Sequence, residues 1–252
     1  MLFKTLNLLG LLSVMCPLAM AKNAKKSPPS PESILAASDR ARGATAQGLT
    51  WKIHIKTTEN GTAASSAYEV KVKGLNVLAQ CTAPPRDKDQ TILFNDRNLW
   101  IFKPGLRKPI SISPRQRLSG QAANGDIATT NYARDYSATL KSIEPVNGVP
   151  AYRLQLKAKS KDVTYDAINY WVTQDSQLGV KAEFLTLEGK IFKRATFKYE
   201  NKATTEGKSV PFVSEMNITD AMFQNNVTII TYEKPESAQI SDTLFNVNNI
   251  AR

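Results

Sequence analysis

The sequence has few of the side chains that carry out catalysis or bind metals. It contains one histidine, His54, and two cysteines, Cys16 and Cys81, among 252 residues. Metal centres need clusters of cysteine, histidine or carboxylate side chains, and none occurs here at ligand spacing. The phosphate-binding glycine loop and the nucleophile elbow of hydrolases are also missing. We therefore expect no enzyme, no catalytic residues, no metal and no cofactor.

The two candidate reactive side chains have simple structural interpretations. His54 alternates with Lys52 and Lys56 on the polar face of an expected strand, so we expect it to be solvated. Cys81 ends an apolar stretch, and the chain offers no second histidine as a proton relay, so a small core residue is favoured over a nucleophile. A hydrolase with two carboxylates, Asp126 among them, is the least favoured alternative.

The first 21 residues have the pattern of a secretory signal. Lys4 is their only charge, residues 8–18 are apolar, and Ala19-Met20-Ala21 fits a small-x-small cleavage site. Met15 stands where a lipoprotein signal has a small residue before its cysteine, so we expect cleavage after residue 21. No later stretch reaches the roughly 18 apolar residues of a spanning helix. The sequence therefore predicts a periplasmic protein of a Gram-negative envelope.

Positive charge dominates the chain, with 33 Lys and Arg against 22 Asp and Glu and a formal net charge of +11. Nucleic acid is a poor partner for an exported protein without a recognition motif. Anionic lipid head groups or an acidic protein surface suit the compartment better. Residues 22–31, KNAKKSPPSP, predict a disordered basic, proline-rich tether.

Residues 32–252 are expected to form one domain, made mainly of strands. A helix is predicted over 31–42, because Ser30-Pro31 resembles an N-cap with proline at N1 and Gly43 a C-terminal stop. After Leu49, apolar and polar residues alternate with a period of two, which predicts about ten half-buried antiparallel strands. Turn signals separate them: Asn60-Gly61, Asn147-Gly148, Glu188-Gly189 and Glu206-Gly207. The stretch from Asp242 to Phe245 fits either a short strand or a helical turn.

A sheet of this size must cover its apolar face. It can close into a barrel, stack as a sandwich, or accept helices as a lid. The predicted helix is too short to cover the sheet, and the basic stretch 115–126 is a candidate second lid element. Apolar surface left uncovered would form a ligand cavity. A sandwich whose two sheets cover each other is the alternative.

Residues 99–102, LWIF, predict a strand that is apolar on both faces and opens directly onto positive charge. One interpretation is that one face lines a cavity whose mouth is ringed by cations able to bind phosphate. The other is a strand covered on both sides and followed by a solvated loop. The candidate rim residues are Lys103, Arg107, Lys108, Arg115 and Arg117.

This stretch also resembles a known family. Asn98-Leu99-Trp100-Ile101-Phe102-Lys103-Pro104-Gly105-Leu106-Arg107-Lys108 is followed by Ser113-Pro114-Arg115-Gln116-Arg117 and then by Asn124-Gly125-Asp126-Ile127. This order is similar to that of the LolA-like outer-membrane lipoprotein-sorting proteins. The segment after Asp126 departs from the family pattern, keeping only the Gly-Asp core and a later aromatic residue.

The resemblance implies an α+β fold that is mainly β: an incomplete, strongly curved antiparallel barrel with a few short helices as a lid over an apolar cavity. It implies a carrier of lipoprotein acyl chains or other lipids across the periplasm, working without chemistry. We further expect a monomer that contacts an inner- or outer-membrane protein or an anionic membrane surface. The candidate cavity-lining residues are Trp51, Ile53, Trp100, Phe102, Leu154, Trp171 and Phe184. The alternative is a non-carrier β-module that binds an envelope protein, such as a transporter, through its basic face.

Overall fold

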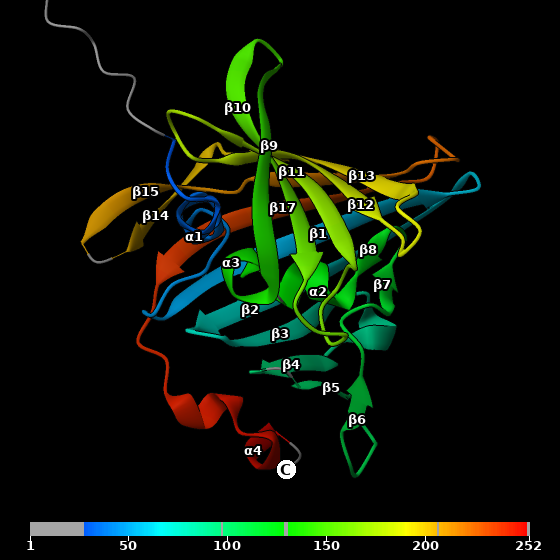
Figure 1. Ribbon diagram of the computed structural model, residues 1–252. Helices are drawn as coiled ribbons and strands as arrows, with labels where there is room; N and C mark the ends of the chain where they lie inside the picture. Colours follow the sequence, from blue (N-terminus) through cyan, green and yellow to red (C-terminus); the bar gives the residue numbers. More distant parts are fainter. Residues whose placement is uncertain (1–27, 97, 129–130, 206, 251–252) are drawn as a thin grey trace, which may run out of the picture.

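One large, curved antiparallel sheet dominates the protein. The computed structural model describes residues 28–96, 98–128, 131–205 and 207–250 (Figure 1). The predicted signal peptide and residues 22–27 of the predicted tether lie outside these ranges. The sheet has thirteen strands, and each pairs antiparallel with its neighbours. In sheet order they are β6 (Ile110–Ile112), β5 (Asn98–Phe102), β4 (Thr91–Asn95), β3 (Asn76–Ala83), β2 (Thr62–Lys73), β1 (Leu49–Glu59), β17 (Val227–Ser237), β16 (Glu215–Asp220), β13 (Ile191–Lys198), β12 (Gly179–Leu185), β11 (Ala167–Thr173), β10 (Val149–Ala158) and β9 (Tyr136–Val146).

The remaining elements are short and lie against this sheet or at its ends. Two small hairpins are not paired into the large sheet. They are β14 (Asn201–Thr205) with β15 (Lys208–Phe212), and β7 (Arg117–Ser119) with β8 (Ala122–Ala123). The helices are α1 (Pro31–Arg40), α2 (Asn124–Ala128), α3 (Tyr132–Asp135) and α4 (Val247–Ile250), with 3₁₀ turns η1 (Pro85–Asp87) and η2 (Asp242–Phe245). Among the described residues, no helix has the length and apolar character needed to cross a bilayer.

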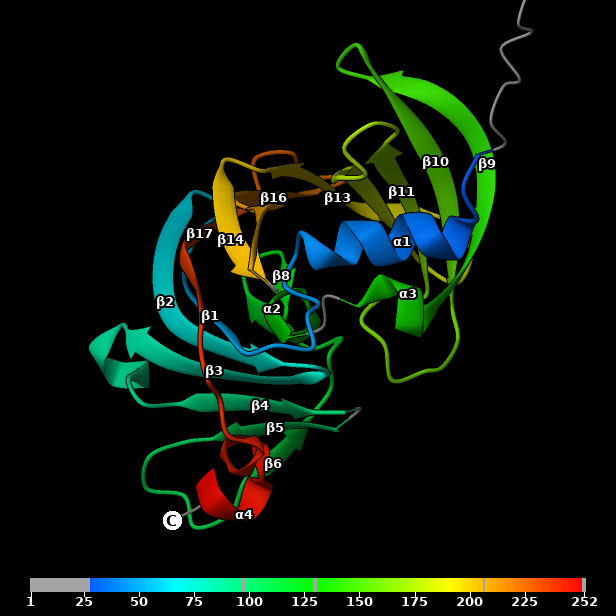
Figure 2. The same ribbon diagram turned by 90° about the vertical axis from the view of Figure 1, so that its left-hand side faces the viewer.

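The sheet bends around α1 without closing. Its end strands β6 and β9 do not pair with each other, and Figure 2 shows α1 lying inside the curve, between β1–β2 and β9–β11. The predicted incomplete barrel with helices as a lid is therefore confirmed. The alternative of two sheets covering each other is wrong, because one continuous sheet carries thirteen of the strands.

Residue alternation explains which face of each strand points into the curve. In β1, Leu49, Trp51, Ile53 and Ile55 are buried in the main core, and the residues between them are more exposed. At the β1–β2 turn, Asn60 and Gly61 both adopt positive φ, as a tight two-residue hairpin turn requires. The predicted turns at 147–148 and 188–189 likewise connect paired strands.

Helix α1 begins where the sequence predicted. The backbone N–H of Ser33 donates to the Ser30 hydroxyl at 3.2 Å, and Pro31 occupies the first helical position. The helix ends at Arg40, two residues earlier than expected, and Gly43 follows with a φ of 105°. A Cβ at residue 43 would lie 2.9 Å from the Trp51 ring, so glycine also permits close packing there.

The sequence analysis expected a few short helices as a lid but did not place them, and it counted too few strands. It predicted about ten strands, whereas the structure has thirteen strands in the sheet and two extra hairpins. Helices α2, α3 and α4 have four or five residues each, too few for a helical period to be visible in the sequence. The stretch from Asp242 to Phe245, left open between strand and helical turn, is the 3₁₀ turn η2.

The inner-face side chains are expected to carry the stability of the fold. Replacing Leu154, which is fully buried on β10, with alanine should lower the free energy of unfolding by about 2–5 kcal/mol, because it leaves a cavity in a packed core. Gln155→Ala, the next position on the exposed face of the same strand, should change it by less than about 0.5 kcal/mol. Urea unfolding followed by circular dichroism measures both. Equal effects would contradict the assignment of the inner face.

Candidate functional site: the lidded concave face

The concave face of the sheet is covered by α1, α3 and residues 113–128, which we call the lid segment. The lid segment contains β7, β8 and α2. Ile34 and Leu35 of α1 are fully buried against the sheet, and Ala122 and Ile127 of the lid segment are buried in the same core. The structure therefore confirms the prediction that the stretch 115–126 supplies a second lid element.

Polar contacts fasten the lid segment to the ends of three sheet strands. Arg117 Nη1 donates to both carboxylate oxygens of Glu59 at 2.9 Å, and Gln121 Nε2 donates to the same carboxylate at 3.0 Å. The Gln121 N–H donates to the Thr228 hydroxyl at 2.7 Å, and Lys193 Nζ donates to the Gln121 carbonyl at 2.6 Å. We call these five residues the lid seam. Neutral hydrogen bonds contribute about 0.5–1.5 kcal/mol each and bonds to charged groups about 1.5–3 kcal/mol, less where the charges are exposed to solvent.

A further ion pair joins two distant parts of the sheet through the lid segment. Arg115 Nη1 lies 2.7 Å from a carboxylate oxygen of Asp166, and Arg115 Nε donates to the Lys161 carbonyl at 3.2 Å. Arg115 follows β6 at one end of the sheet, whereas Asp166 lies between β10 and β11 near the other. This contact therefore spans the opening of the incomplete barrel.

The five predicted rim cations divide into two groups. Lys103, Arg107 and Lys108 are exposed on the β5–β6 loop and form no ion pair with any described residue. Arg115 and Arg117 hold the lid segment in place through Asp166 and Glu59. The structure thus leaves three of the five charges free for a partner.

Four of the seven predicted cavity-lining residues come together on the concave face. Trp51, Ile53, Leu154 and Phe184 belong to the main core under the lid. Tyr165 stacks on Phe184 with ring centroids 3.9 Å apart and ties this part of the core to the lid segment. Trp51, Ile53, Leu154 and Phe184 are at most 3% exposed, so the closed lid shields them from solvent.

The other three predicted lining residues lie on the opposite face of the sheet. Trp100 and Phe102 pack under the C-terminal segment, residues 238–250, together with Phe245. Trp171 lies between Arg153 and Lys181, with the Lys181 ammonium 4.1 Å from its ring centroid. Leu99 and Ile101 are the residues of β5 that contact the main core. Both faces of this strand are therefore covered, each by a different part of the chain.

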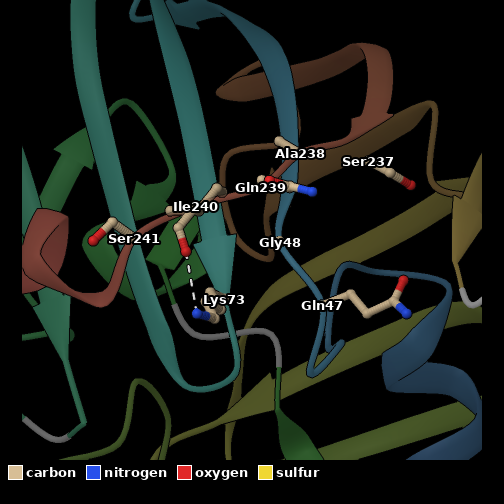
Figure 3. Close-up of a pocket in the computed structure, with 8 residues that line it drawn as sticks. All are labelled: Gln47, Gly48, Lys73, Ser237, Ala238, Gln239, Ile240 and Ser241. Atoms are coloured by element: carbon tan, nitrogen blue, oxygen red, sulfur yellow. Dashed lines mark hydrogen bonds between the residues drawn. The ribbon is translucent and has the colours of Figure 1, made fainter.

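The C-terminal segment also borders an open groove on the outside of the sheet. The groove has a volume of about 690 Å³ and is shown in Figure 3. Lys73 Nζ donates to the Ile240 carbonyl at 3.1 Å and lies 2.9 Å from a carboxylate oxygen of Asp242, which fixes the segment across the sheet. None of the residues lining this groove is among the predicted site residues.

Sequence analysis missed a buried polar pair beneath α1. The Arg42 guanidinium lies 4.7 Å from the ring centroid of Tyr132 and 4.8 Å from that of Phe197, and its Nη1 has no hydrogen-bond partner. Asp39 Oδ2 accepts from the Ala133 N–H at 2.8 Å, whereas its Oδ1 has no partner. Burial raises the pKa of the Asp39 carboxyl to about 7. In the sequence, Asp39 and Arg42 are visible only as charged residues near the end of the expected helix, within Ser38-Asp39-Arg40-Ala41-Arg42.

Asp126, the acid named for the hydrolase alternative, has a structural role in this arrangement. Its oxygens accept from the Tyr165 hydroxyl at 2.9 and 3.0 Å, and Oδ2 accepts from the Ala123 N–H at 2.8 Å. Burial raises its pKa, and nearby Lys193 opposes that effect. No group of three or more metal-ligating side chains occurs among the residues that the structure describes.

Comparisons with known proteins agree with this geometry. A solved structure of LolA superfamily protein NE2245 from Nitrosomonas europaea is 30% identical, with a TM-score of 0.77 over 86% of this chain and 98% of that one. A domain described as an outer membrane lipoprotein-sorting protein domain, from Vibrio parahaemolyticus, is 16% identical, with a TM-score of 0.73 over 86% of this chain and 97% of that one. A DUF1329 family protein from Desulfovibrio piger is 17% identical, with a TM-score of 0.72 over 87% of this chain and 97% of that one.

A family model described as "-like: Uncharacterized protein" matches residues 75–252. No curated protein sequence matches the chain. The curved open sheet with a helical lid is the fold that these solved structures share with the protein. The chain belongs to the LolA superfamily.

The buried carboxyl of Asp39 predicts how stability depends on pH. Its folded pKa of about 7 exceeds the unfolded value of about 3.9, so the native state holds the extra proton between these two values. The stability that this proton provides is present at low pH and is lost as the pH rises towards 7. Asparagine at position 39 does not titrate. The free energy of unfolding of Asp39→Asn, minus that of the unmutated protein, should therefore rise by about 1.4 kcal/mol per pH unit between the two pKa values.

Urea unfolding of both proteins at several pH values from 4.5 to 8 measures this difference. Asp162→Asn, at an exposed position on the β10–β11 loop, is the matched control and should show a constant difference. A constant difference for Asp39→Asn as well would contradict a raised pKa in the folded protein.

Proposed function

We propose that this protein is an exported periplasmic carrier that binds acyl chains of lipoproteins or other lipids and helps move them towards the outer membrane. The observation that supports this best is the cover of the concave apolar face. That face is closed by short helices and a loop held through polar contacts, and not by a second sheet. An interior of this kind can open without breaking the pairing of the sheet.

The energetics favour an acyl chain as the cargo. Burying a chain yields about 0.8 kcal/mol for each methylene, so a long chain outweighs the few hydrogen bonds of the lid seam. Trp51, Ile53, Leu154 and Phe184 are proposed as the residues that contact the chain once α1 and the lid segment move away. Trp100, Phe102 and Trp171 would contribute only from the outer face.

The charged residues of the proposed carrier would direct encounters. Lys103, Arg107 and Lys108 are free to approach an anionic membrane surface or an acidic face of an inner- or outer-membrane protein. The proposed carrier does not modify its cargo chemically and does not bind nucleic acid. We also propose that the protein has a cleaved signal peptide, lies in the periplasm and is a monomer. The name of the Vibrio parahaemolyticus neighbour, which refers to lipoprotein sorting in the outer membrane, supports it.

The second candidate is a non-carrier module that binds an envelope protein, such as a transporter, through its basic face. The observation that favours it is the tight closure of the core, since Ile53, Leu154 and Phe184 have no exposed surface. A module of this kind would keep its interior filled with its own side chains.

Native mass spectrometry with lipid extraction separates the two candidates. The protein is purified from its own periplasm, and its bound molecules are identified. The carrier should retain phospholipid or an acylated peptide in stoichiometric amount. A mass without ligand, together with no uptake of added lipid, would contradict the carrier and favour the module.

Weakening the lid seam should speed the entry of apolar ligands. Glu59→Gln with Arg117→Ala removes the ion pair at 2.9 Å and loosens the lid segment while leaving the core unchanged. Uptake of a fluorescent fatty acid, followed by stopped flow, should become several-fold faster. Lys198→Ala breaks an ion pair of the same length with Glu215 on the outside of the sheet and should leave uptake unchanged. Equal uptake rates in all three proteins would show that the seam does not limit access.

A further inference from the structure

Three large apolar side chains project into solvent from two turns of the sheet. Leu187 in the β12–β13 turn is 81% exposed, and Met222 and Phe223 in the β16–β17 turn are 81% and 62% exposed. They are the most exposed large apolar residues among those that the structure describes. We call Leu187, Met222 and Phe223 the apolar tips. Closing the lid gives no reason for these three side chains to be exposed.

The register of the sheet brings the two turns together on one edge. Lys193 of β13 pairs with Asp220 of β16, and Leu185 of β12 pairs with Ile191 of β13. The turns are therefore about two strand spacings apart, or about 10 Å. The Ala221 N–H donates to the Phe192 carbonyl at 3.0 Å and links the β16–β17 turn to the start of β13. Both turns lie at the right-hand side of Figure 1.

The turns hold these side chains outward through satisfied backbone contacts. Asp220 Oδ1 accepts the N–H groups of Met222 and Phe223 at 2.8 and 2.9 Å, and the Asn226 N–H donates to the Phe223 carbonyl at 2.8 Å. In the other turn, the Gly189 N–H donates to the Thr186 carbonyl at 2.9 Å.

Charged residues of both signs lie near the tips, and Asp220 at the start of the β16–β17 turn is one of the acids. Lys190 lies in the same turn as Leu187, is exposed, and forms no ion pair with any described residue. Arg194 is exposed on β13, and Arg117 of the lid seam remains 64% exposed beside Glu59. Glu188 is the exposed acid of the β12–β13 turn and stays ionised, because a hydrogen bond with Thr186 lowers its pKa. Lys190 and Arg194, which form no ion pair with any described residue, can thus meet an anionic surface, while Glu188 limits how deeply Leu187 can enter it.

We propose that this edge docks on an anionic lipid bilayer, with Leu187, Met222 and Phe223 inserted among the head groups. Protein interfaces concentrate their binding energy in a contiguous, desolvated cluster. Here the apolar groups are separate projections with cations around them, which matches the requirements of the membrane interface. Docking at this edge does not depend on the cargo, and it uses residues other than the basic β5–β6 loop.

The same edge carries the lid seam. Thr228 lies at the start of β17 directly after the β16–β17 turn, Lys193 lies near the start of β13, and Glu59 ends β1. A bilayer in contact with the tips would therefore lie next to the contacts that close the lid. If the protein is a carrier, as proposed above, the membrane would meet it where the interior opens.

Cosedimentation of the cargo-free protein with vesicles tests the docking. Vesicles of phosphatidylcholine with phosphatidylglycerol should bind the native protein more strongly than vesicles of phosphatidylcholine alone. The triple variant Leu187→Ser, Met222→Ser and Phe223→Ser should bind at least tenfold more weakly. The matched control is Ile143→Ser with Val149→Ser on the β9–β10 hairpin, where the side chains are 53% and 48% exposed at the opposite edge. This control should bind like the native protein.

A second measurement places the tips directly. In Phe223→Trp, the added fluorescence should shift to shorter wavelength on mixing with the anionic vesicles, whereas Val149→Trp should show no shift. Failure of the native protein to bind either vesicle, or native-like binding by the triple variant, would overturn the proposal. Concentration-dependent dimerisation that the triple variant loses, without vesicle binding, would overturn it in favour of a second copy of the chain. The lipid-extraction result is independent of these outcomes, so the carrier and the docking can fail separately.

Discussion

The architecture depends on one constraint, which is that a single sheet with an apolar face has no second sheet to cover it. Water must be excluded from that face by other means, because exposed apolar area costs roughly 25 cal/mol per Å². The sheet bends until its distant parts are linked through Arg115 and Asp166, and α1 with the lid segment occupies what remains of the opening. Curvature, lid and buried interior are consequences of this one requirement.

The lid differs from the sheet in the forces that hold it. Strands are joined by continuous ladders of backbone hydrogen bonds, whereas the lid segment is fastened largely through side chains, including Glu59, Arg117 and Gln121. Beneath α1, Asp39 and Arg42 are buried with polar atoms unpaired, and such groups lower the stability of the closed arrangement. Within one fold, the cover therefore depends on side-chain contacts where the sheet depends on backbone ladders. In the proposed carrier, a cover of this kind would move without breaking the ladders of the sheet.

How well each part could be predicted follows from the range of the interactions involved. The alternation that predicts strands after Leu49 is visible in β1 and β10, because alternation is a local property of the chain. Helices α2 and α3 were missed, because they are held by contacts with distant residues, such as the Ala133 N–H with Asp39. The rim cations were found as a group, but only the fold shows that Arg115 and Arg117 have partners more than forty residues away.

The sequence by itself determined the mainly β class, the position of α1, the main turns and the resemblance of residues 98–127 to a lipoprotein-sorting family. These features depend on local periodicity, capping and turn residues, which act over a few residues. The tertiary structure decided which face of β5 points inward. It did so because residues 238–250, distant in the chain, cover Trp100 and Phe102, while the sheet's curvature turns Leu99 and Ile101 to the core. It also placed Leu187 beside Met222 and Phe223, since only strand register brings two separate turns to one edge.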